Sequence, residues 1–274
     1  MKSFAFDDWD GGRLTVNREF AALLTRHALT TFDAIANFSG GQVAKNAVRE
    51  RTTTRLDLAN ADGATRTLFL KRHQQSGLWE LVKPLLRLTR PIVGARNEWE
   101  AILRFHAVGI ATMVPVALGE AGGRSFLMTQ GIDGCQKLTA WMDSHKHAVH
   151  NGELESLRKI VAGVADAART MHAAGLHHQD FYLTHLMLPQ NGAAAPIHVL
   201  DLGRARFQRR LARRWVVKDL AQLNYSADGV SSSERLRFLA CYLGRKVTHG
   251  DRAFMTSIVR KSRAIARHSR KNGL

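Results

Sequence analysis

Residues 177–185, HHQDFYLTH, constrain the fold more than any other segment, because a second acidic residue, Asp201, follows them after a short interval. Two apolar runs, 186–188 and 197–200, are separated by turn-forming residues and predict a hairpin with Asp201 at the end of its second strand. Phosphoryl-transfer enzymes use one Asp on a loop to orient the acceptor hydroxyl and a second near a strand end to hold a metal ion. The order of Asp180 and Asp201 predicts these two roles.

The residues before this segment predict a long buried helix. Apolar side chains recur there at helical spacing, and Gly175 then supplies a C-terminal stop. The members of this apolar face are Leu154, Leu157, Ile160, Val161, Val164, Ala168 and Met171. Helix, loop, hairpin and metal-binding residue therefore follow one another in the order found in kinases.

An upstream lysine extends the pattern. Residues 67–71 predict an apolar strand that ends in Lys71, and a helix-like segment that contains Glu98 follows. In kinases such a lysine binds the α and β phosphates of the nucleotide, and a helical glutamate orients it. Glu100 competes for this role, but Glu98 is favoured because it adjoins the predicted buried face of the helix.

Each of these residues has an ordinary explanation when it is taken alone. Asp180 fits a turn or a helix N-cap, Asp201 fits a strand end, and Lys71 fits a solvated strand edge. Only their joint order, together with Glu98 and His185, favours a kinase-type fold.

With this order established, the chain resembles the lipopolysaccharide core kinases of the WaaP and InaA type, which phosphorylate heptose or Kdo sugars of the inner core. The resemblance covers most of the chain and lies in residues 93–102, 109–113, 177–185, 200–205 and 214–221. It implies an α+β, bilobal, protein-kinase-like fold. Residues 1–130 would form a small lobe with an antiparallel sheet and one main helix, and residues 131–274 a larger, mostly helical lobe with the catalytic and metal loops.

The resemblance also implies how ATP would bind. Lys71 would hold its phosphates, and the adenine would lie against the backbone of Gln130 to Ile132. The glycine pair Gly40 and Gly41 would let the backbone approach the phosphates. This pair lacks a full G-x-G-x-x-G pattern and is also compatible with an ordinary turn.

In the larger lobe the resemblance assigns catalysis to Asp180 and support of its loop to His178 and Asp219. His178 would hold the loop through backbone contacts, and Asp219 would tie it down from beneath. Gln179 stands where many kinases have Arg, so it cannot pair with a phosphorylated activation loop.

The metal ion would be bound by Asp201 and His185. Ordinary protein kinases carry Asn five residues after the catalytic Asp, whereas the lipopolysaccharide kinases resemble this chain in having His. Mg²⁺ prefers oxygen ligands, so an imidazole at this position would act through a water molecule or favour Mn²⁺.

The net charge of +17 predicts an anionic partner: nucleic acid, acidic lipid or an acidic glycolipid. The aromatic content of 7% offers no stacking platform, so we expect no nucleic acid. The C-terminal residues, with Arg260 and Lys261 among six clustered cations, predict a basic amphipathic helix that either packs on its own lobe or binds an anionic membrane surface. Residues 78–88 mix apolar and basic side chains and would either contact lipid or the lipid-linked acceptor or pack on their own lobe.

The location is predicted from the absence of targeting signals. Acidic residues occupy the N-terminal segment where a signal peptide needs an apolar core, and no apolar run approaches about 18 residues. Cys135 and Cys241 form neither a ligand motif nor a disulfide framework. We therefore expect a cytoplasmic protein that is peripheral at the inner membrane.

Together these features predict an ATP-dependent kinase of an inner-core sugar, heptose rather than Kdo, with the lipopolysaccharide core glycolipid as acceptor. Two alternatives stay open. A small-molecule phosphotransferase of the aminoglycoside or choline kinase type would share the lobes and both aspartates, but its acceptor would more often be a cation. A degenerate kinase would instead serve as a non-catalytic scaffold at the membrane, which Gln179 and the short glycine pair suggest.

Overall fold

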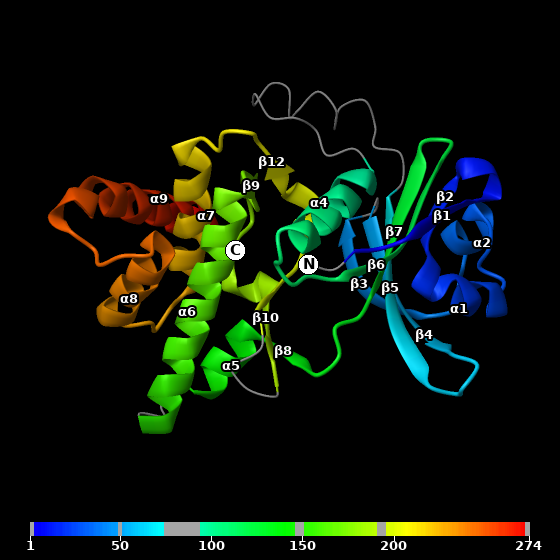
Figure 1. The fold of residues 1–274 in the computed structure, drawn as a ribbon, viewed down its shortest axis with the longest axis horizontal. Coiled ribbons are helices and arrows are strands. Elements are labelled where there is room, and N and C mark those ends of the chain that lie inside the picture. Colours follow the sequence, from blue (N-terminus) through cyan, green and yellow to red (C-terminus); the bar gives the residue numbers. More distant parts are fainter. Residues whose placement is uncertain (1–2, 49–50, 74–93, 146–150, 191–195, 272–274) are drawn as a thin grey trace. The chain divides into compact units, whose positions relative to one another are not determined.

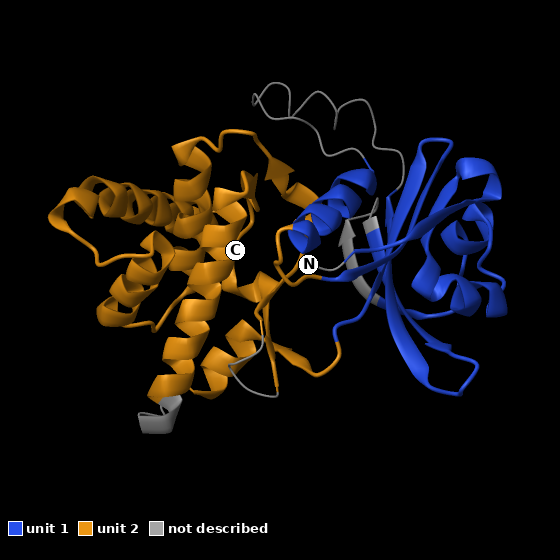
Figure 2. Ribbon diagram, viewed as in Figure 1, with its two compact units in different colours: residues 1–107, 113–132 blue, residues 108–112, 133–274 orange. Residues whose placement is uncertain are grey.

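The computed structural model describes residues 3–48, 51–73, 94–145, 151–190 and 196–271. The chain forms two compact units (Figure 2). Unit 1 contains Met1–Ala107 and Met113–Ile132, and unit 2 contains Val108–Thr112 and Asp133–Leu274. The predicted apolar and basic segment 78–88 lies outside the described residues.

Unit 1 is built on a seven-stranded antiparallel sheet in the order β1-β2-β6-β7-β5-β4-β3 (Figure 1). Its strands are β1 Phe6–Trp9, β2 Leu14–Asn17, β3 Gln42–Val48, β4 Arg51–Ala59, β5 Thr65–His73, β6 Val114–Ala121 and β7 Arg124–Gln130. Its described α-helices are α1 Ala21–Arg26, α2 Phe32–Ala36 and α4 Arg96–Ala107.

Strand β5 shows how the sheet separates its two faces. Successive side chains of a strand point to opposite faces, so Leu68, Leu70 and Arg72 share one face while Phe69 and Lys71 share the other. Both leucines are fully buried in a core that includes the apolar side chains of α1 and α2. Helix α4 covers the opposite face, which is the face of Lys71 (Figure 1).

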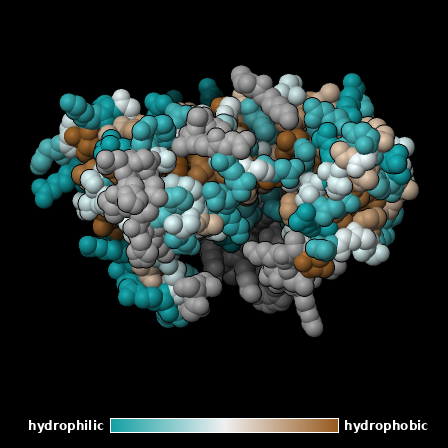
Figure 3. Space-filling view, turned by 90° about the horizontal axis from the view of Figure 1, so that it is seen from below, coloured by the Kyte–Doolittle hydropathy of each residue, from teal (hydrophilic) through white to brown (hydrophobic). Residues whose placement is uncertain are grey.

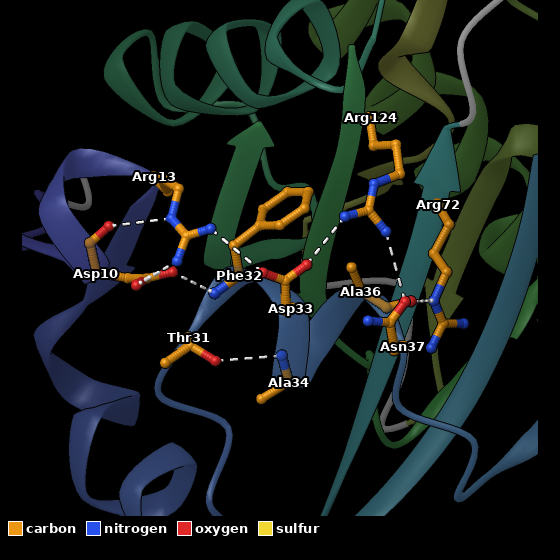
Figure 4. A network of polar contacts seen from close by, with 10 residues as sticks. All are labelled: Asp10, Arg13, Thr31, Phe32, Asp33, Ala34, Ala36, Asn37, Arg72 and Arg124. Carbon is orange, nitrogen blue, oxygen red and sulfur yellow. Dashed lines mark hydrogen bonds and ion pairs between the residues drawn. The ribbon is translucent and has the colours of Figure 1, made fainter. Parts of the chain in front are cut away.

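A network of arginines fastens helix α2 to the sheet (Figure 4). The Nε–H of Arg72 donates to the carbonyl oxygen of Ala36 over 2.7 Å, at the end of the helix where carbonyls lack helical partners. Asp33 accepts from Arg13 and from Arg124, at 3.2 and 2.9 Å. Arg72 therefore anchors β5 on one face, while the adjacent Lys71 lies on the other.

Unit 2 is mostly helical. Its α-helices are α5 Leu138–Ser144, α6 Asn151–Ala173, α7 Arg213–Ser226, α8 Ser232–Leu243 and α9 Arg252–Lys271. Its short strands are β8 Cys135–Lys137, β9 Leu176–His177, β10 Leu186–Pro189, β11 His198–Val199 and β12 Arg206–Phe207. Strands β8, β10 and β11 form one small sheet, and β9 pairs with β12.

The predicted α+β class is confirmed, and so are the elements around the two aspartates. Helix α6 supplies the predicted buried helix, and β10 pairs with β11 in the predicted antiparallel hairpin. Gly175 ends the helix region with φ of +76°, and the carbonyl oxygen of Gln208 lies where a side chain at this position would begin. Helices α1 and α2 were not predicted.

The predicted C-terminal amphipathic helix is α9. Its apolar side is packed within unit 2, because Ile258 and Ser262 are buried and the Ser262 hydroxyl donates to the carbonyl oxygen of Ala221 on α7 over 3.0 Å. Its cations lie on the other side, exposed. No helix in the described part of the chain is long and apolar enough to cross a membrane. On the face shown in Figure 3, hydrophobic residues form small patches among hydrophilic ones.

Candidate active site

In unit 1, Lys71 and Glu98 form an ion pair. The Nζ of Lys71 lies 2.6 Å from Oε1 of Glu98, and the two side chains are 26% and 5% exposed. Glu100, the competing candidate, is exposed on the other side of α4. A buried carboxylate needs a cation to offset its lost hydration, so Glu98 fixes the position of the ammonium group. The partly exposed ammonium can still contact a phosphate.

The residues predicted to meet the rest of the nucleotide also lie in unit 1. Gly40 and Gly41 directly precede β3, while the turn between β3 and β4 lies outside the described residues. Gly41 has a structural role of its own: its φ is +145°, and a Cβ there would lie 2.6 Å from the carbonyl oxygen of Arg55. Gln130 ends β7, and the N–H of the next residue, Gly131, donates to the carbonyl oxygen of Thr67 over 2.8 Å.

In unit 2, Asp219 holds the start of the segment 178–185, which we call the catalytic loop. Its carboxylate is fully buried and accepts the backbone N–H groups of His178 and Gln179, at 2.7 and 2.8 Å. Burial alone would raise the pKa of Asp219, but the hydrogen bond and electrostatic interaction with His172 and the hydrogen bond from the N–H of His178 outweigh it, so the pKa lies below its ordinary value. The carboxylate is therefore charged at neutral pH.

The rest of the loop is held by two further side chains of helix α7. The side-chain oxygen of Gln222 accepts the N–H of Phe181 over 3.1 Å, and the hydroxyl of Ser226 accepts the N–H of Leu183 over 2.9 Å. Asp219, Gln222 and Ser226 lie at i, i+3 and i+7, which places them along one face of the helix. This polar stripe satisfies buried backbone donors that would otherwise be costly.

His178 holds the loop from within. Its Nδ1 accepts the N–H of Asp180 over 3.2 Å, so the proton is on Nε2, which donates to the carbonyl oxygen of Leu200 over 2.8 Å. The ring is completely buried, and burial lowers the pKa of His178. The neutral ring of His178, with its proton on Nε2, thus connects Leu200, the residue before Asp201, to the catalytic loop at Asp180.

Gln179 connects the same two loops a second time. Its backbone has φ of +70°, which is strained for a residue with a side chain. Its side-chain amide donates to the carbonyl oxygen of Arg204 over 3.0 Å. The position that is Arg in many kinases therefore holds the metal loop by a neutral hydrogen bond, which needs no phosphorylated partner.

His185 and Asp201 form the candidate metal site. The Nδ1 of His185 lies 2.8 Å from the carbonyl oxygen of Asp180 and must donate to it, which leaves Nε2 with its lone pair. That Nε2 lies 3.6 Å from Oδ2 of Asp201, whose side chain is 53% exposed. A ligating His that donates its other nitrogen to a carbonyl is typical of metal sites.

Asp201 and His185 would supply only part of the ligands of a metal ion. Nucleotide phosphates and water would supply the others. No cluster of three or more His, Cys, Asp or Glu able to hold a metal occurs among the described residues. Mg²⁺ in phosphoryl-transfer sites is usually held by one or two carboxylates together with the phosphates of the substrate. Asp201 with His185 supplies such a partial set.

Comparisons with known proteins show the family of the chain. A model of the lipopolysaccharide kinase (Kdo/WaaP) family matches residues 40–242. The chain belongs to this family. The lipopolysaccharide core heptose(I) kinase WaaP of Escherichia coli strain K12 is 32% identical over 238 residues, 82% of this chain and 87% of that protein. The enzyme of the same name from Pseudomonas aeruginosa strain PAO1 is 36% identical over 191 residues, 66% of this chain and 70% of its own.

A solved structure agrees with this placement. The structure titled "WaaP in complex with acyl carrier protein" has a TM-score of 0.71 and 28% sequence identity, and the match covers 92% of this chain and 98% of that one. The chain is therefore a kinase, a phosphotransferase that acts on a sugar hydroxyl.

Three functional residues of this Kdo/WaaP family kinase were missed by the sequence analysis. Gln222 and Ser226 hold the catalytic loop, and Arg204 donates through Nη1 to Oδ1 of Asp180 over 3.1 Å. A polar stripe that continues from Asp219 along one face of α7 was the signal available for the first two. Arg204 stands in a run of cations, and no pattern distinguished it from the others.

Proposed function

We propose that this kinase transfers the γ-phosphoryl group of ATP to a heptose hydroxyl of the lipopolysaccharide inner core. The observation that carries the proposal is the loop of unit 2, in which backbone hydrogen bonds position the partly buried Asp180 and His185 Nε2 lies 3.6 Å from Oδ2 of Asp201. The family match and the names of the relatives supply the acceptor class, and heptose is favoured over Kdo by the heptose(I) kinases among them.

In the proposed reaction the acceptor hydroxyl donates its proton to the carboxylate of Asp180 as its oxygen bonds to the γ phosphorus. The bond from that phosphorus to the bridging oxygen breaks, and ADP leaves with the electron pair. Lys71 would hold the α and β phosphates, and Glu98 would keep Lys71 in place. A divalent metal ion held by Asp201 and His185, Mg²⁺ or Mn²⁺, would neutralise phosphate charge.

The remaining nucleotide contacts belong to the same proposal. The adenine would bond to backbone groups from Gln130 to Ile132, and Gly40 and Gly41 would lie near the phosphates. The N–H of Gly131 already donates to Thr67, so the adenine would use other backbone groups of this segment. The position of the glycine pair before β3, and its packing role, give little support to its placement near the phosphates.

The test is ATP consumption with purified core oligosaccharide by the wild type and by Asp180→Ala and Asp201→Ala. We expect each substitution to lower kcat by at least about 100-fold, since general-base and electrostatic contributions are each of that order. Unchanged turnover in either variant would remove the mechanism. A missing nucleotide-dependent rise in melting temperature, with Mg²⁺ or Mn²⁺ present, would instead favour the scaffold alternative.

The surroundings of Asp180 argue against a kinase of cationic small molecules. Arg204 contacts Asp180 directly, and the segment 202–218 contains seven Lys and Arg residues and no acidic residue. A cationic acceptor would be repelled by this charge, whereas an acidic glycolipid would be attracted.

We further propose that the kinase works at an anionic membrane surface on the cytoplasmic side. The basic face of α9 carries exposed cations, and its apolar side is already packed, so binding would be electrostatic rather than by insertion. The cations are Arg260, Lys261, Arg263, Arg267, Arg270 and Lys271. Sedimentation with vesicles that contain anionic lipid should fall steeply as salt rises.

An acyl carrier protein is a second proposed partner, because the similar solved structure is titled as a complex with one. Unit 2 contains an apolar cavity of 380 Å³, lined from α5 to α9, that would suit an acyl chain. Leu236 lines it and is 45% exposed, whereas Leu154 is 38% exposed and does not line it. Leu236→Glu should weaken co-purification with acylated carrier protein, and Leu154→Glu should not.

A further inference from the structure

A second cation, Lys218, borders the face of helix α7 that holds the catalytic loop, one turn before Gln222, whose side chain bonds Phe181 and Gln179. Lys218, on helix α7, is half-buried, and its Nζ lies 5.6 Å from the centre of the Trp215 ring. Burial lowers the pKa of Lys218, while Asp180 raises it and the neighbouring Arg204 lowers it. The geometry agrees with one cluster: Arg204 lies 3.1 Å from Asp180, and Gln179 bonds both the carbonyl of Arg204 and the carboxylate of Asp219, the neighbour of Lys218.

Two carboxylates, those of Asp180 and Asp219, act on Lys218 electrostatically, but each is bonded to other groups. Asp180 is paired with Arg204, and both carboxylate oxygens of Asp219 are occupied by the loop backbone. Within the described part of the chain, Lys218 has no carboxylate within ion-pair distance. A partly desolvated ammonium without a paired carboxylate is costly, and an anionic ligand would offset that cost.

The backbone around the cluster is held by hydrogen bonds, which suits it to binding one ligand rather than to general attraction. The carbonyl of Arg204 is fixed by Gln179, and Lys218 directly precedes the buried Asp219. The Trp215 ring is held between Arg214, whose guanidinium carbon is 5.1 Å from its centre, and His177, whose ring is stacked 4.8 Å away. Arg204 and Lys218 therefore extend from anchored elements of the chain. They belong to the same cluster as Asp180, the residue that would take the proton of the acceptor hydroxyl.

We propose that Arg204 and Lys218 form an anion site that binds an acidic group of the sugar acceptor, a carboxylate or a phosphate adjacent to the hydroxyl that is phosphorylated. The site would hold the acceptor by its charge and so place its hydroxyl at Asp180. Displacement of Arg204 from Asp180 by that acidic group would also free the carboxylate to take the proton. This inference rests on the proposed function for the identity of the acceptor but not for the existence of the site.

The test is acceptor binding without nucleotide, measured by calorimetry with deacylated core oligosaccharide. Lys218→Met keeps the apolar stem over Trp215 and removes the charge. We expect it to raise Kd about tenfold, the loss typical of one charge-assisted contact, and to raise KM more than it lowers kcat. Arg210→Gln removes an equal charge from an exposed residue of the same segment and should leave Kd within about twofold. Thermal melting checks that both variants fold.

Two modified acceptors identify the acidic group. One has its carboxylates converted to methyl esters, and the other has its phosphates removed. The difference in Kd between wild type and Lys218→Met should vanish for one of them. Equal binding of the unmodified oligosaccharide by both proteins, or a difference that persists with both modified acceptors, overturns the anion site. If the wild type binds with this charge dependence but transfers no phosphate, the proposed function fails and the site stands.

Discussion

The imidazole of His185 donates through Nδ1 to the backbone carbonyl of Asp180, five residues earlier, over 2.8 Å. The catalytic loop therefore determines which nitrogen of His185 is directed at Asp201. Under the proposed function the loop would have two functions at once: the side chain of Asp180 would serve the acceptor, and its carbonyl would orient a metal ligand.

His185→Ala should lower metal-dependent nucleotide affinity by about tenfold or more, which is the usual loss when a ligand or its support is removed. His185→Asn should restore part of that affinity for Mg²⁺ in particular, because an amide oxygen suits Mg²⁺ better than an imidazole nitrogen. Nucleotide binding titrated with Mg²⁺ and with Mn²⁺ measures both. His249, which is exposed on the same unit, provides the control substitution to Ala. Equal metal dependence in His185→Ala and wild type would exclude His185 from the site.

Glu98→Gln should lower kcat/KM for ATP by about 100-fold, because a displaced lysine misplaces the phosphates. Glu100→Gln is the matched control, since Glu100 lies on the same helix, is exposed, and does not pair with Lys71. It should change kcat/KM by no more than about twofold. Steady-state kinetics with ATP varied decides the matter, and similar losses in the two variants would contradict the role given to Glu98.

Gln222→Ala should destabilise unit 2 by about 1–3 kcal/mol, because the buried N–H of Phe181 loses its acceptor. Activity should fall together with stability, since the same bond positions the residues around Asp180. Gln190→Ala, at an exposed side chain after β10, should leave both unchanged. Chemical denaturation and hydrogen exchange of residues 178–183 measure the effect. A Gln222→Ala variant with wild-type exchange in this loop would show that α7 does not hold it.

The stability of the protein should depend on pH through His177. Burial lowers the pKa of His177 to about 4, below its ordinary value of 6.5. Between these values the unfolded chain binds the proton that the folded chain refuses, so folding stability falls as the pH drops from about 6.5 to 4.

His177→Phe keeps the ring that stacks on Trp215 and removes the titrating group. Its melting temperature should therefore fall less between pH 7 and pH 5 than that of the wild type. Part of the pH dependence should remain, because burial lowers the pKa of His178 in the same direction. His249→Phe, at an exposed position, serves as the control and should retain the wild-type slope.

The parts of the fold that could be predicted are those that depend on residues close together in the sequence. Helix α6 and the β10–β11 hairpin follow from apolar spacing and turn residues within a few positions of one another. Helices α1 and α2 are only six and five residues long, too short for a helical period to be seen.

The support of the site could be predicted only in part, because its partners are far apart in sequence. Gln222 and Ser226 would suit a solvated helix face, and only the arrival of a loop from some 40 residues earlier buries them. Arg204 is one of seven cations in a short segment, and its contact with Asp180 depends on the tertiary structure. Lys71 and Glu98 were predicted as a pair because an apolar strand and a helix face are themselves local features, although β5 runs two residues past the predicted end at Lys71.

The central claim is that this kinase uses Asp180 and Asp201 to phosphorylate a core sugar. Mass spectrometry of core oligosaccharide tests this claim most directly. The oligosaccharide should come from cells in which the gene is deleted. These cells then receive a copy of the wild-type gene, a copy that encodes Asp180→Ala, or no copy. We predict that one phosphoryl group is missing from a heptose in the deleted cells, returns with the wild type, and stays missing with Asp180→Ala. Full phosphorylation of that heptose in the cells that carry only Asp180→Ala would contradict the account.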